Sequence, residues 1–135
     1  MIQRLQSLYL TTAIVLNFAV FFSPIYERAM EDPQKWIGIG LASSLLVAMI
    51  INGLVIALYK HREKQILWLK RSSFMQIVSF GFALGIIFSL GGIGTYLWDE
   101  AVGTVLILLA FASQFLAVKK IKKDIDLVKS MDRIR

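Results

Sequence analysis

The sequence predicts an all-α, integral membrane four-helix bundle with both termini in the cytoplasm and a short amphipathic helix at the C-terminus. Apolar residues make up 57% of the 135 residues, the mean hydropathy is +0.67, and these residues gather in four segments. Basic residues are abundant in every second connection and scarce in the others. A soluble domain of this length would struggle to bury so much apolar surface, whereas a bilayer is itself an apolar solvent.

The four predicted spans form one membrane domain, residues 1–135, with a tail helix at its C-terminal end. About 20 apolar residues cross the hydrocarbon core at 1.5 Å per residue. The spans are residues 5–22, 36–59, 72–97 and 101–118, and the tail helix is residues 119–135.

Helix ends follow from proline and glycine. Pro24 is expected to end the first span and to leave residues 23–35 as a loop. Asp32 and Pro33 are typical of the N-cap and first turn of the second span. The apolar stretch 66–69 is flanked by basic residues, so it is predicted to lie at the interface, where it could form an early start of the third helix. Helix termination is also expected at three glycines, which are Gly91, Gly92 and Gly94.

Charge sets the orientation. Of the 15 Lys and Arg residues, Arg28 and Lys35 lie in the connection between spans one and two. The connection between spans three and four has no Lys or Arg, and the other 13 basic residues lie at the termini or in the connection between spans two and three. The positive-inside rule therefore places both termini and the 60–71 connection in the cytoplasm. In the tail, Ile121, Ile125 and later apolar residues repeat at helical spacing, which predicts an amphipathic helix continuous with the fourth span.

The basic cytoplasmic residues are candidates for contact with anionic lipid, with a protein partner or with ribosomal RNA. Lipid contact requires nothing beyond charge and is the default expectation. Three acids, Asp124, Asp126 and Asp132, interrupt the tail and favour specific polar partners. The candidate residues are Arg4, Lys119, Lys120, Lys122, Lys123, Lys129, Arg133 and Arg135.

No catalytic constellation is present in the sequence. The chain has no Cys, which excludes thiol redox chemistry and Cys-based metal sites. His61 is the single histidine and is interpreted as a solvated residue, so neither a metal nor a cofactor is predicted. The acids expected on the outer side are interpreted as solvated loop residues, not as a metal-dependent lipid enzyme; they are Glu27, Glu31, Asp32, Asp99 and Glu100.

The predicted spans contain no Asp, Glu, Lys, Arg or His, although ion-coupled carriers usually place such a residue inside the bundle. The size is similar to that of small multidrug exporters, which use a glutamate in the first helix. Here the first span offers Asn17, Thr11 and Thr12 instead. Proton-coupled export is therefore not expected.

A polar layer is predicted about 6 to 10 Å from the cytoplasmic ends of the spans. It would contain Asn52, Gln76 and Gln114, with Thr11 and Thr12 at a similar depth. Hydrogen bonds between helices contribute about 0.6 kcal/mol on average in membranes. Packing between helices is favoured over a ligand site.

Small residues recur every four positions on two spans. Gly40, Ser44 and Ala48 lead to Asn52 on the second span. On the third span the corresponding residues are Gly81, Gly85 and Ser89. Such faces let two helix backbones approach closely. Packing within the bundle and docking of a partner are both open interpretations.

The two ends of the chain carry distinctive motifs, MIQRLQSLYL at residues 1–10 and IKKDIDLVKSMDRIR at residues 121–135. With them the chain resembles an uncharacterised family of small four-helix inner-membrane proteins from the Bacteroidota, a domain of unknown function. The resemblance implies a bacterial inner-membrane location with both termini inside. It implies no activity, substrate or cofactor.

The expected function is that of a non-enzymatic accessory or scaffold subunit, which packs against larger integral membrane proteins. A protein-export or membrane-insertion assembly is one host that the basic cytoplasmic side favours. The alternative is a small oligomeric transporter or channel for a neutral or lipid-like solute. The sequence identifies no small-molecule substrate.

Overall fold

The computed structural model describes residues 2–31, 33, 35–89 and 97–135, and within these residues the chain is all-α with no strand. The all-α prediction is confirmed. The five helices are α1 (Ile2–Val20), α2 (Pro24–Glu31), α3 (Trp36–Ala57), α4 (Arg62–Ser89) and α5 (Leu97–Ile134).

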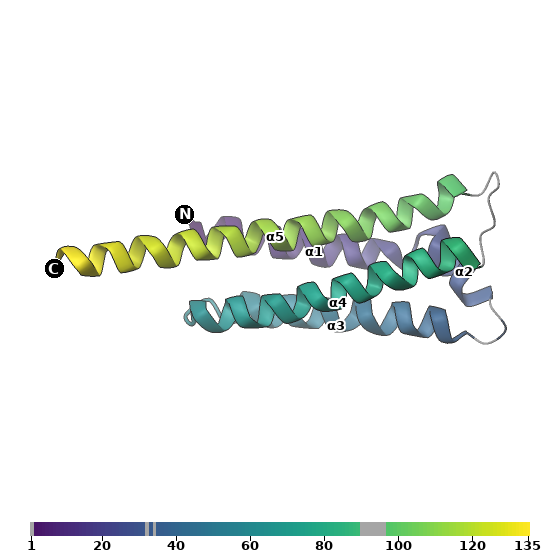
Figure 1. Cartoon of the computed structure of the whole chain (residues 1–135), viewed down its shortest axis with the longest axis horizontal. Helices are drawn as coiled ribbons and strands as arrows, with labels where there is room; N and C mark the ends of the chain where they lie inside the picture. The colour runs from purple at the N-terminus through teal and green to yellow at the C-terminus, as the bar shows by residue number, and fades with distance from the viewer. Residues whose placement is uncertain (1, 32, 34, 90–96) are drawn as a thin grey trace.

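The four longer helices lie side by side in an elongated bundle, and α2 covers one end of it (Figure 1). The start of α1, the α3–α4 turn and the C-terminal end of α5 share the opposite end. Helix α5 has 38 residues, or about 57 Å at helical rise, and extends past its neighbours at that end. We call the two ends the α2 end and the tail end.

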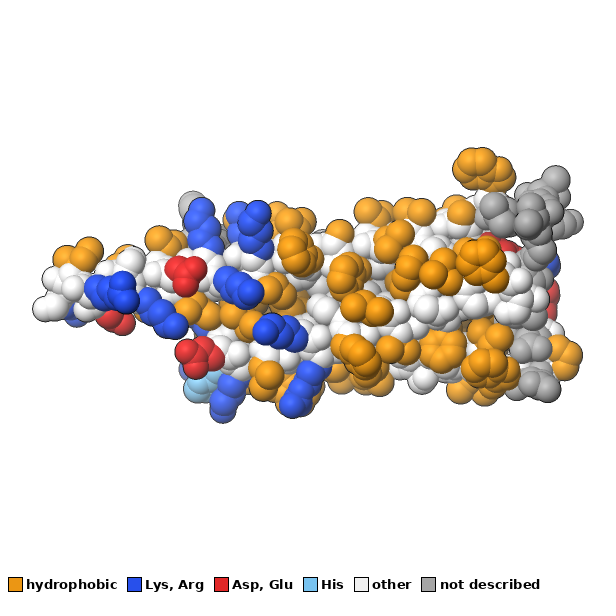
Figure 2. Space-filling model, viewed as in Figure 1, with side chains coloured by type: hydrophobic (Ala, Val, Ile, Leu, Met, Phe, Trp, Pro, Cys, Tyr) orange, Lys and Arg blue, Asp and Glu red, His pale blue; other side chains and the backbone are white. Residues whose placement is uncertain are grey.

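The surface is apolar over much of its length and basic at the tail end. Figure 2 shows hydrophobic side chains spread over the part of the bundle nearer α2, and Lys and Arg side chains gathered toward the tail end. Large side chains such as Phe18, Ile50, Phe74, Ile77 and Phe115 are more than half exposed. A continuous apolar surface of this extent is typical of contact with lipid or with other proteins.

Helices α3, α4 and α5 are each long and apolar enough to cross a membrane. Helices α1 and α2 are bent by 47° relative to one another and provide a fourth span if the pair is counted as one. Length and composition therefore indicate a membrane protein with three or four spans.

The predicted loop at residues 23–35 is wrong in part, because Pro24 opens α2. Proline suits the first position of a helix, where its missing amide has no intrahelical partner to lose. Ser23 is buried and its hydroxyl donates to the carbonyl of Val20 at 2.5 Å, which shapes the bend. Ile25 and Ala29 then bury one side of α2 against the bundle.

The predicted N-cap of the second span is also wrong. Helix α3 begins at Trp36, and Lys35 before it has φ 52° and makes no side-chain capping bond. Pro33 therefore lies outside the first turn, and Asp32 lies outside the described residues. The helix ends at Ala57, close to the predicted end.

Helix α4 begins at Arg62, ten residues before the predicted start of the third span. Residues 66–69 belong to this early start of the helix: Leu69 is buried in the core, and Gln65 donates to the carbonyl of Val55 at 2.8 Å. The helix ends at Ser89; the glycines predicted to terminate it lie outside the described residues. Helix α5 continues without a break into the predicted tail helix.

Two apolar clusters make up the core. The one nearer α2 is built on Val20, Ile25, Ala29, Ile37, Leu41, Leu45, Ala83, Ile86 and Ile107. The one nearer the tail end is built on Leu10, Ile51, Val55, Leu69, Ala117 and Ile121. Buried polar side chains on α1, α4 and α5, among them Asn17, Gln76 and Gln114, lie between these two clusters.

Candidate functional site

A reciprocal pair of amides joins α1 to α4 in the middle of the bundle. The Asn17 Nδ2 donates to Gln76 Oε1 at 2.9 Å, and the Gln76 Nε2 donates back to Asn17 Oδ1 at 2.8 Å. The same Gln76 nitrogen lies 3.2 Å from the carbonyl oxygen of Ile107 on α5. Both side chains are at most 1% exposed. Away from water, buried amides must satisfy each other or lose several kcal/mol.

A second group of bonds joins α3, α4 and α5. The Ser72 hydroxyl donates to Asn52 Oδ1 at 2.8 Å and accepts from Gln114 Nε2 at 3.2 Å. Gln114 Nε2 also lies 3.4 Å from Gln76 Oε1, which links this group to the first pair. We call Asn17, Asn52, Ser72, Gln76 and Gln114 the polar network. It connects all four long helices.

The structure brings together the three predicted members of the polar layer, Asn52, Gln76 and Gln114. It does not include Thr11 and Thr12, which are exposed; the Thr12 hydroxyl donates to the carbonyl of Leu8 in its own helix at 2.8 Å.

Asn17 and Ser72 complete the network and were not placed in it from the sequence. Asn17 follows Leu10 by seven residues and Ala13 by four, so helical periodicity puts all three on one buried face. That spacing was the signal that could have identified Asn17.

The predicted depth of the layer below the membrane surface stays a prediction, whereas its position along the helices is observed. Gln76 lies 14 residues after Arg62, or about 21 Å along α4, because the helix starts earlier than predicted. The network therefore sits near the middle of α4. Its members carry no ionisable group, and their polar atoms are mostly used by one another.

Two network atoms have no partner among the described residues: Asn52 Nδ2 and Gln114 Oε1, both buried. Asn52 Nδ2 is a donor and Gln114 Oε1 is an acceptor. Both side chains also bond to the hydroxyl of Ser72. Neutral amides in this arrangement fix the register of helices and carry no acid–base chemistry.

The small-residue face of α3 packs inside the bundle. A Cβ at Gly40 would lie 2.5 Å from the Phe82 ring of α4. Ser44 accepts a hydrogen bond from Ser79 at 2.8 Å, and Ala48 is fully buried. The α3 face is thus used for internal packing, and the docking interpretation of that face is wrong.

The small-residue face of α4 is open. A Cβ at Gly81 or Gly85 would have no described atom within 4 Å, apart from its own helix backbone. Gly81 and Ser89 are exposed, and the Ser89 hydroxyl bonds to the carbonyl of Gly85 in the same helix. This face has no neighbour in the described part of the chain.

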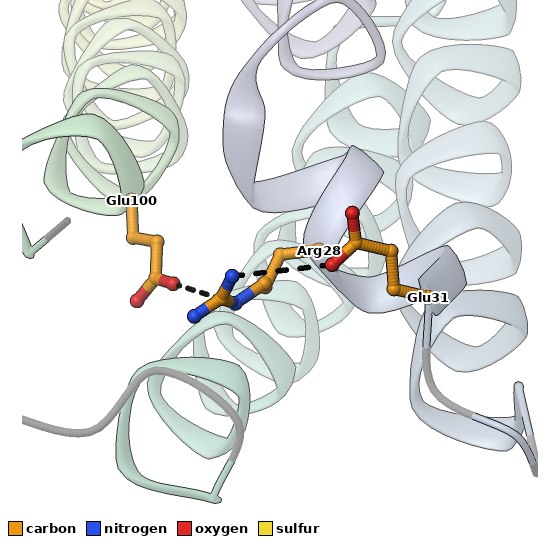
Figure 3. Close-up of polar contacts among 3 residues, drawn as sticks. All are labelled: Arg28, Glu31 and Glu100. Atoms are coloured by element: carbon orange, nitrogen blue, oxygen red, sulfur yellow. Dashed lines mark ion pairs between the residues drawn. The ribbon is translucent and has the colours of Figure 1, made fainter.

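An ion pair braces α2 against α5 at the α2 end (Figure 3). The Arg28 Nε lies 3.4 Å from Glu100 Oε1, and Arg28 Nη1 lies 3.9 Å from Glu31 Oε2. Glu100 is 3% exposed and lies in the first turn of α5, where the helix dipole favours a negative charge. The prediction that Glu100 is a solvated loop residue is wrong.

The other outer acids surround the same place. A cleft of about 120 Å³ is lined by Pro24, Glu27, Arg28, Glu31, Asp99 and Glu100. No group of three His, Cys, Asp or Glu in the described residues is arranged to hold a metal ion. Asp32, predicted among these acids, lies outside the described residues.

Helices α2 and α5 approach closely beside this ion pair. A Cβ at Gly103 would overlap the Ile25 side chain and lie 2.8 Å from the Ser23 hydroxyl. Arg28 therefore ties together two segments that are already packed in contact, so the ion pair serves as a structural brace.

The basic candidate residues lie at the tail end, mostly exposed. Lys120 is partly buried, and the side chain of Arg4 lies outside the described residues. Those exposed are Lys119, Lys122, Lys123, Lys129, Arg133 and Arg135. The tail acid Asp124 pairs with Arg62 of α4 at 3.2 Å, so one of the three tail acids has an internal partner.

The tail changes from buried to exposed along its length. Ile121 is fully buried, whereas Val128 is 42% exposed, Met131 66% and Ile134 88%. The helix leaves the bundle in this stretch (Figure 1). Its last turns carry apolar side chains that no other described helix covers.

A hollow between α4 and α5 is almost entirely apolar. It measures about 310 Å³ and is lined by Gln76, Ile77, Phe80, Ile107, Leu108 and Phe111. The Gln76 amide is already used within the polar network. The hollow therefore offers an apolar surface with no spare polar group from that residue.

These features define a small helical protein with apolar, membrane-length helices and no assembled catalytic group in its described part. Residues 29–134 match the model of the family described as Domain of unknown function (DUF4293), and the chain belongs to that family. The predicted membership of an uncharacterised domain family is thereby confirmed. No curated protein and no solved structure matches the chain.

Proposed function

We propose that this protein is a non-enzymatic accessory or scaffold subunit of a larger complex in the bacterial inner membrane. The observation that carries the proposal is the end of α5, which extends beyond the bundle with exposed apolar side chains among basic ones. An exposed apolar helix face in water is costly unless a partner covers it.

The proposed topology has four spans, with α1 and α2 together as one bent span and both termini in the cytoplasm. The shared position of the tail, the α3–α4 turn and the start of α1 supports it. So does the distribution of Lys and Arg, since basic connections are retained on the cytoplasmic side. Arg28, one of the two exceptions, is held by Glu100 at the other end.

The polar network supports a structural role for the interior. Its amides bond to one another across four helices, which leaves few atoms for a solute and none that titrates. The open face of α4 at Gly81 and Gly85 supports contact with a helix of a larger integral membrane protein.

A protein-export or membrane-insertion assembly is the host that we propose. The basic tail end would contact its cytoplasmic parts, with anionic lipid or ribosomal RNA as further contacts. The charge and the position of the tail end support this host.

The test is crosslinking in cells, followed by purification of the natively expressed chain in mild detergent and mass spectrometry. We expect a stoichiometric set of larger membrane proteins. Crosslinks from Gly81→Cys in α4 should reach a transmembrane helix, whereas Ser44→Cys, buried against α4, serves as the matched negative position. Recovery of the chain alone, as a free monomer, would refute the subunit proposal.

A second candidate is a small oligomeric transporter or channel for a neutral or lipid-like solute. The apolar hollow of about 310 Å³ between α4 and α5 favours it, because ligand cavities are typically a few hundred Å³ and mainly apolar. Flux of a labelled lipid across liposomes containing the purified chain tests it. Filling the hollow with Leu108→Trp should abolish flux if the hollow is the route, and flux equal to that of empty liposomes would exclude this candidate.

A further inference from the structure

A groove lies at the tail end, where α5 passes the α3–α4 turn. It measures about 570 Å³, and its apolar part is formed by Tyr59, Ile125 and Val128. Tyr59 is 52% exposed and Val128 is 42% exposed, so these side chains are accessible. A second hollow of about 320 Å³ adjoins it and shares Ile125.

The groove is preformed, because its walls are tied together. The Arg62 Nε lies 3.2 Å from Asp124 Oδ2, which joins the start of α4 to α5. Gln65 donates to the carbonyl of Val55 at 2.8 Å, which joins α4 to the end of α3. A preformed groove does not have to be ordered at the moment of binding, which favours affinity.

The rim of the groove is cationic. Lys60, Arg62 and Lys129 line it together with one acid, Glu63. The charge of Arg62 is used by Asp124, whereas among the described residues neither Lys60 nor Lys129 forms an ion pair. Lys60 lies 5.7 Å from the centre of the Tyr59 ring, so its charge stays near the apolar part of the groove. An occupant with negative charges beside an apolar surface would complement both parts.

The depth of the groove separates a lipid headgroup from a protein as its occupant. The apolar run of α5 ends at Val118; Ile125 lies about 10 Å and Lys129 about 16 Å further along the helix. On α4, Arg62 lies about 14 Å below Arg71. Each headgroup layer is only about 5 to 8 Å thick. With the bundle upright in the membrane, the α4 and α5 walls of the groove lie beyond the lipid headgroups, whereas Tyr59, at the end of the apolar run of α3, lies at the membrane surface.

We propose that this groove binds an amphipathic helical segment of a partner protein, apolar on one face and acidic on the flanking positions. The inference rests on the proposed function and names the cytoplasmic docking site within it. Apolar side chains of the segment lie against Ile125 and Val128, as in other helix-in-groove complexes. Its carboxylates lie near Lys60 and Lys129, which steer the encounter and fix the orientation.

The binding test uses the purified full chain in nanodiscs of zwitterionic lipid. The probe is a fluorescent synthetic 16-residue helical peptide with Leu on one face and Glu beside it, and the comparison peptide has Lys in place of Glu. We expect the acidic peptide to bind at least tenfold more tightly and to weaken as salt is raised. Equal binding of the two peptides would overturn the proposal.

Two variants with the same change of charge distinguish binding in the groove from general attraction of the peptide by the basic tail. Lys129→Glu changes the rim and should weaken binding of the acidic peptide about fivefold to tenfold. Lys123→Glu lies in the same helix but does not line the groove, and should change binding less than twofold. Equal loss in both variants would show general attraction by the tail and would contradict a specific site. Circular dichroism and elution volume check that both variants are folded.

A lipid occupant is the other outcome that the test can detect. Anionic phosphatidylglycerol vesicles are added as competitor to wild-type and Lys129→Glu nanodiscs. Displacement of the peptide that disappears in Lys129→Glu would identify a headgroup site and overturn the proposal for a protein segment. No displacement beyond that by zwitterionic vesicles is expected.

A photo-crosslinking amino acid placed at Val128 identifies the natural occupant in cells, with Leu109 as the control position on the apolar surface of the same helix. We expect Val128 to label an acidic amphipathic segment, and Lys129→Glu to abolish that labelling. An intact multi-protein complex with no labelling from Val128 would refute the groove and leave the subunit proposal standing. A free monomer in cells whose purified form still binds the acidic peptide selectively would refute the subunit proposal and leave the groove standing.

Discussion

The amide pair between Asn17 and Gln76 provides the sharpest test of how the bundle is held together. The perturbation is a double-mutant cycle with Asn17→Leu, Gln76→Leu and the two changes combined. Asn17→Leu leaves the Gln76 amide its contacts with Ile107 and Gln114 alone, and Gln76→Leu leaves the Asn17 amide without a partner among the described residues. Both side chains are at most 1% exposed, so water cannot replace the lost bonds. The combined change removes both amides and fills similar volume with apolar atoms, so it should cost less than the sum of the single changes.

The magnitude follows from the geometry. The pair makes two hydrogen bonds, of 2.9 and 2.8 Å. Interhelical bonds measured by such cycles in a membrane protein average about 0.6 kcal/mol and reach about 1.7 kcal/mol. Two bonds therefore give a coupling of about 1.2 kcal/mol, or roughly an eightfold change in the ratio of folded to unfolded protein.

The assay is reversible unfolding in mixed micelles with increasing dodecyl sulfate, monitored by the fluorescence of the native tryptophans. The free energy of unfolding is obtained for the four proteins of the cycle under one set of conditions. A coupling below about 0.3 kcal/mol would mean that the pair acts as two independent residues, and would refute the network as a determinant of stability. A matched cycle on Thr12 and Gln76, which are not bonded, should give no coupling.

Further predictions concern the helix contacts. Gly40→Ala should lower the free energy of unfolding by about 1 kcal/mol, because the added methyl group overpacks against the neighbouring helix. Gly81→Ala on the open face should leave the stability of the isolated chain unchanged or slightly raised. Equal losses in micelle unfolding would contradict the assignment of the two faces. Gly103→Ala should cost about 2 kcal/mol and make the chain near residue 24 more sensitive to protease, since α2 cannot stay docked; unchanged proteolysis would refute this. Glu100→Gln should lower the free energy of unfolding by about 1 kcal/mol in the same assay; the loss stays this small because Arg28 is partly exposed and can be rehydrated. Glu27→Gln, at an exposed position of the same cleft, should cause no measurable loss. A similar loss in both variants would contradict a structural role of the Arg28–Glu100 ion pair.

The apolar periodicity and the charges predict the helices well, because long membrane-type helices are determined mainly by composition. The span 36–59 and the continuous fourth span and tail correspond closely to α3 and α5. The helix starts were less predictable. Pro24 both ends one helix and begins another, and the same residue type is compatible with either role.

The candidate site illustrates a different limit. Asn52, Gln76 and Gln114 were identified because polar residues are conspicuous in apolar segments. Which residues bond to them depends on the rotation of each helix and on the level at which neighbours meet. Asn17 and Ser72 enter the network through that register, which a single sequence does not encode in its composition.

Glu100 shows why charge counting alone cannot separate a solvated acid from a buried one. Its position beside Asp99 in a short connection is typical of a solvated turn. The structure buries it because α2, itself absent from the prediction, brings Arg28 to the start of α5. An error in one element thus produced an error in the environment of a residue more than sixty positions away.

Surfaces that have no packing partner within the chain are the places where this protein can bind other molecules. Inside the bundle, the small-residue face of α3 and the amides of the network have their partners within the chain. Outside it, the α4 face at Gly81 and the last turns of α5 have none among the described residues. Lipid can cover the first of these surfaces, whereas in the proposed orientation the α4 and α5 walls of the groove at the tail end lie beyond the headgroups. The groove is therefore the place for which we propose a protein partner.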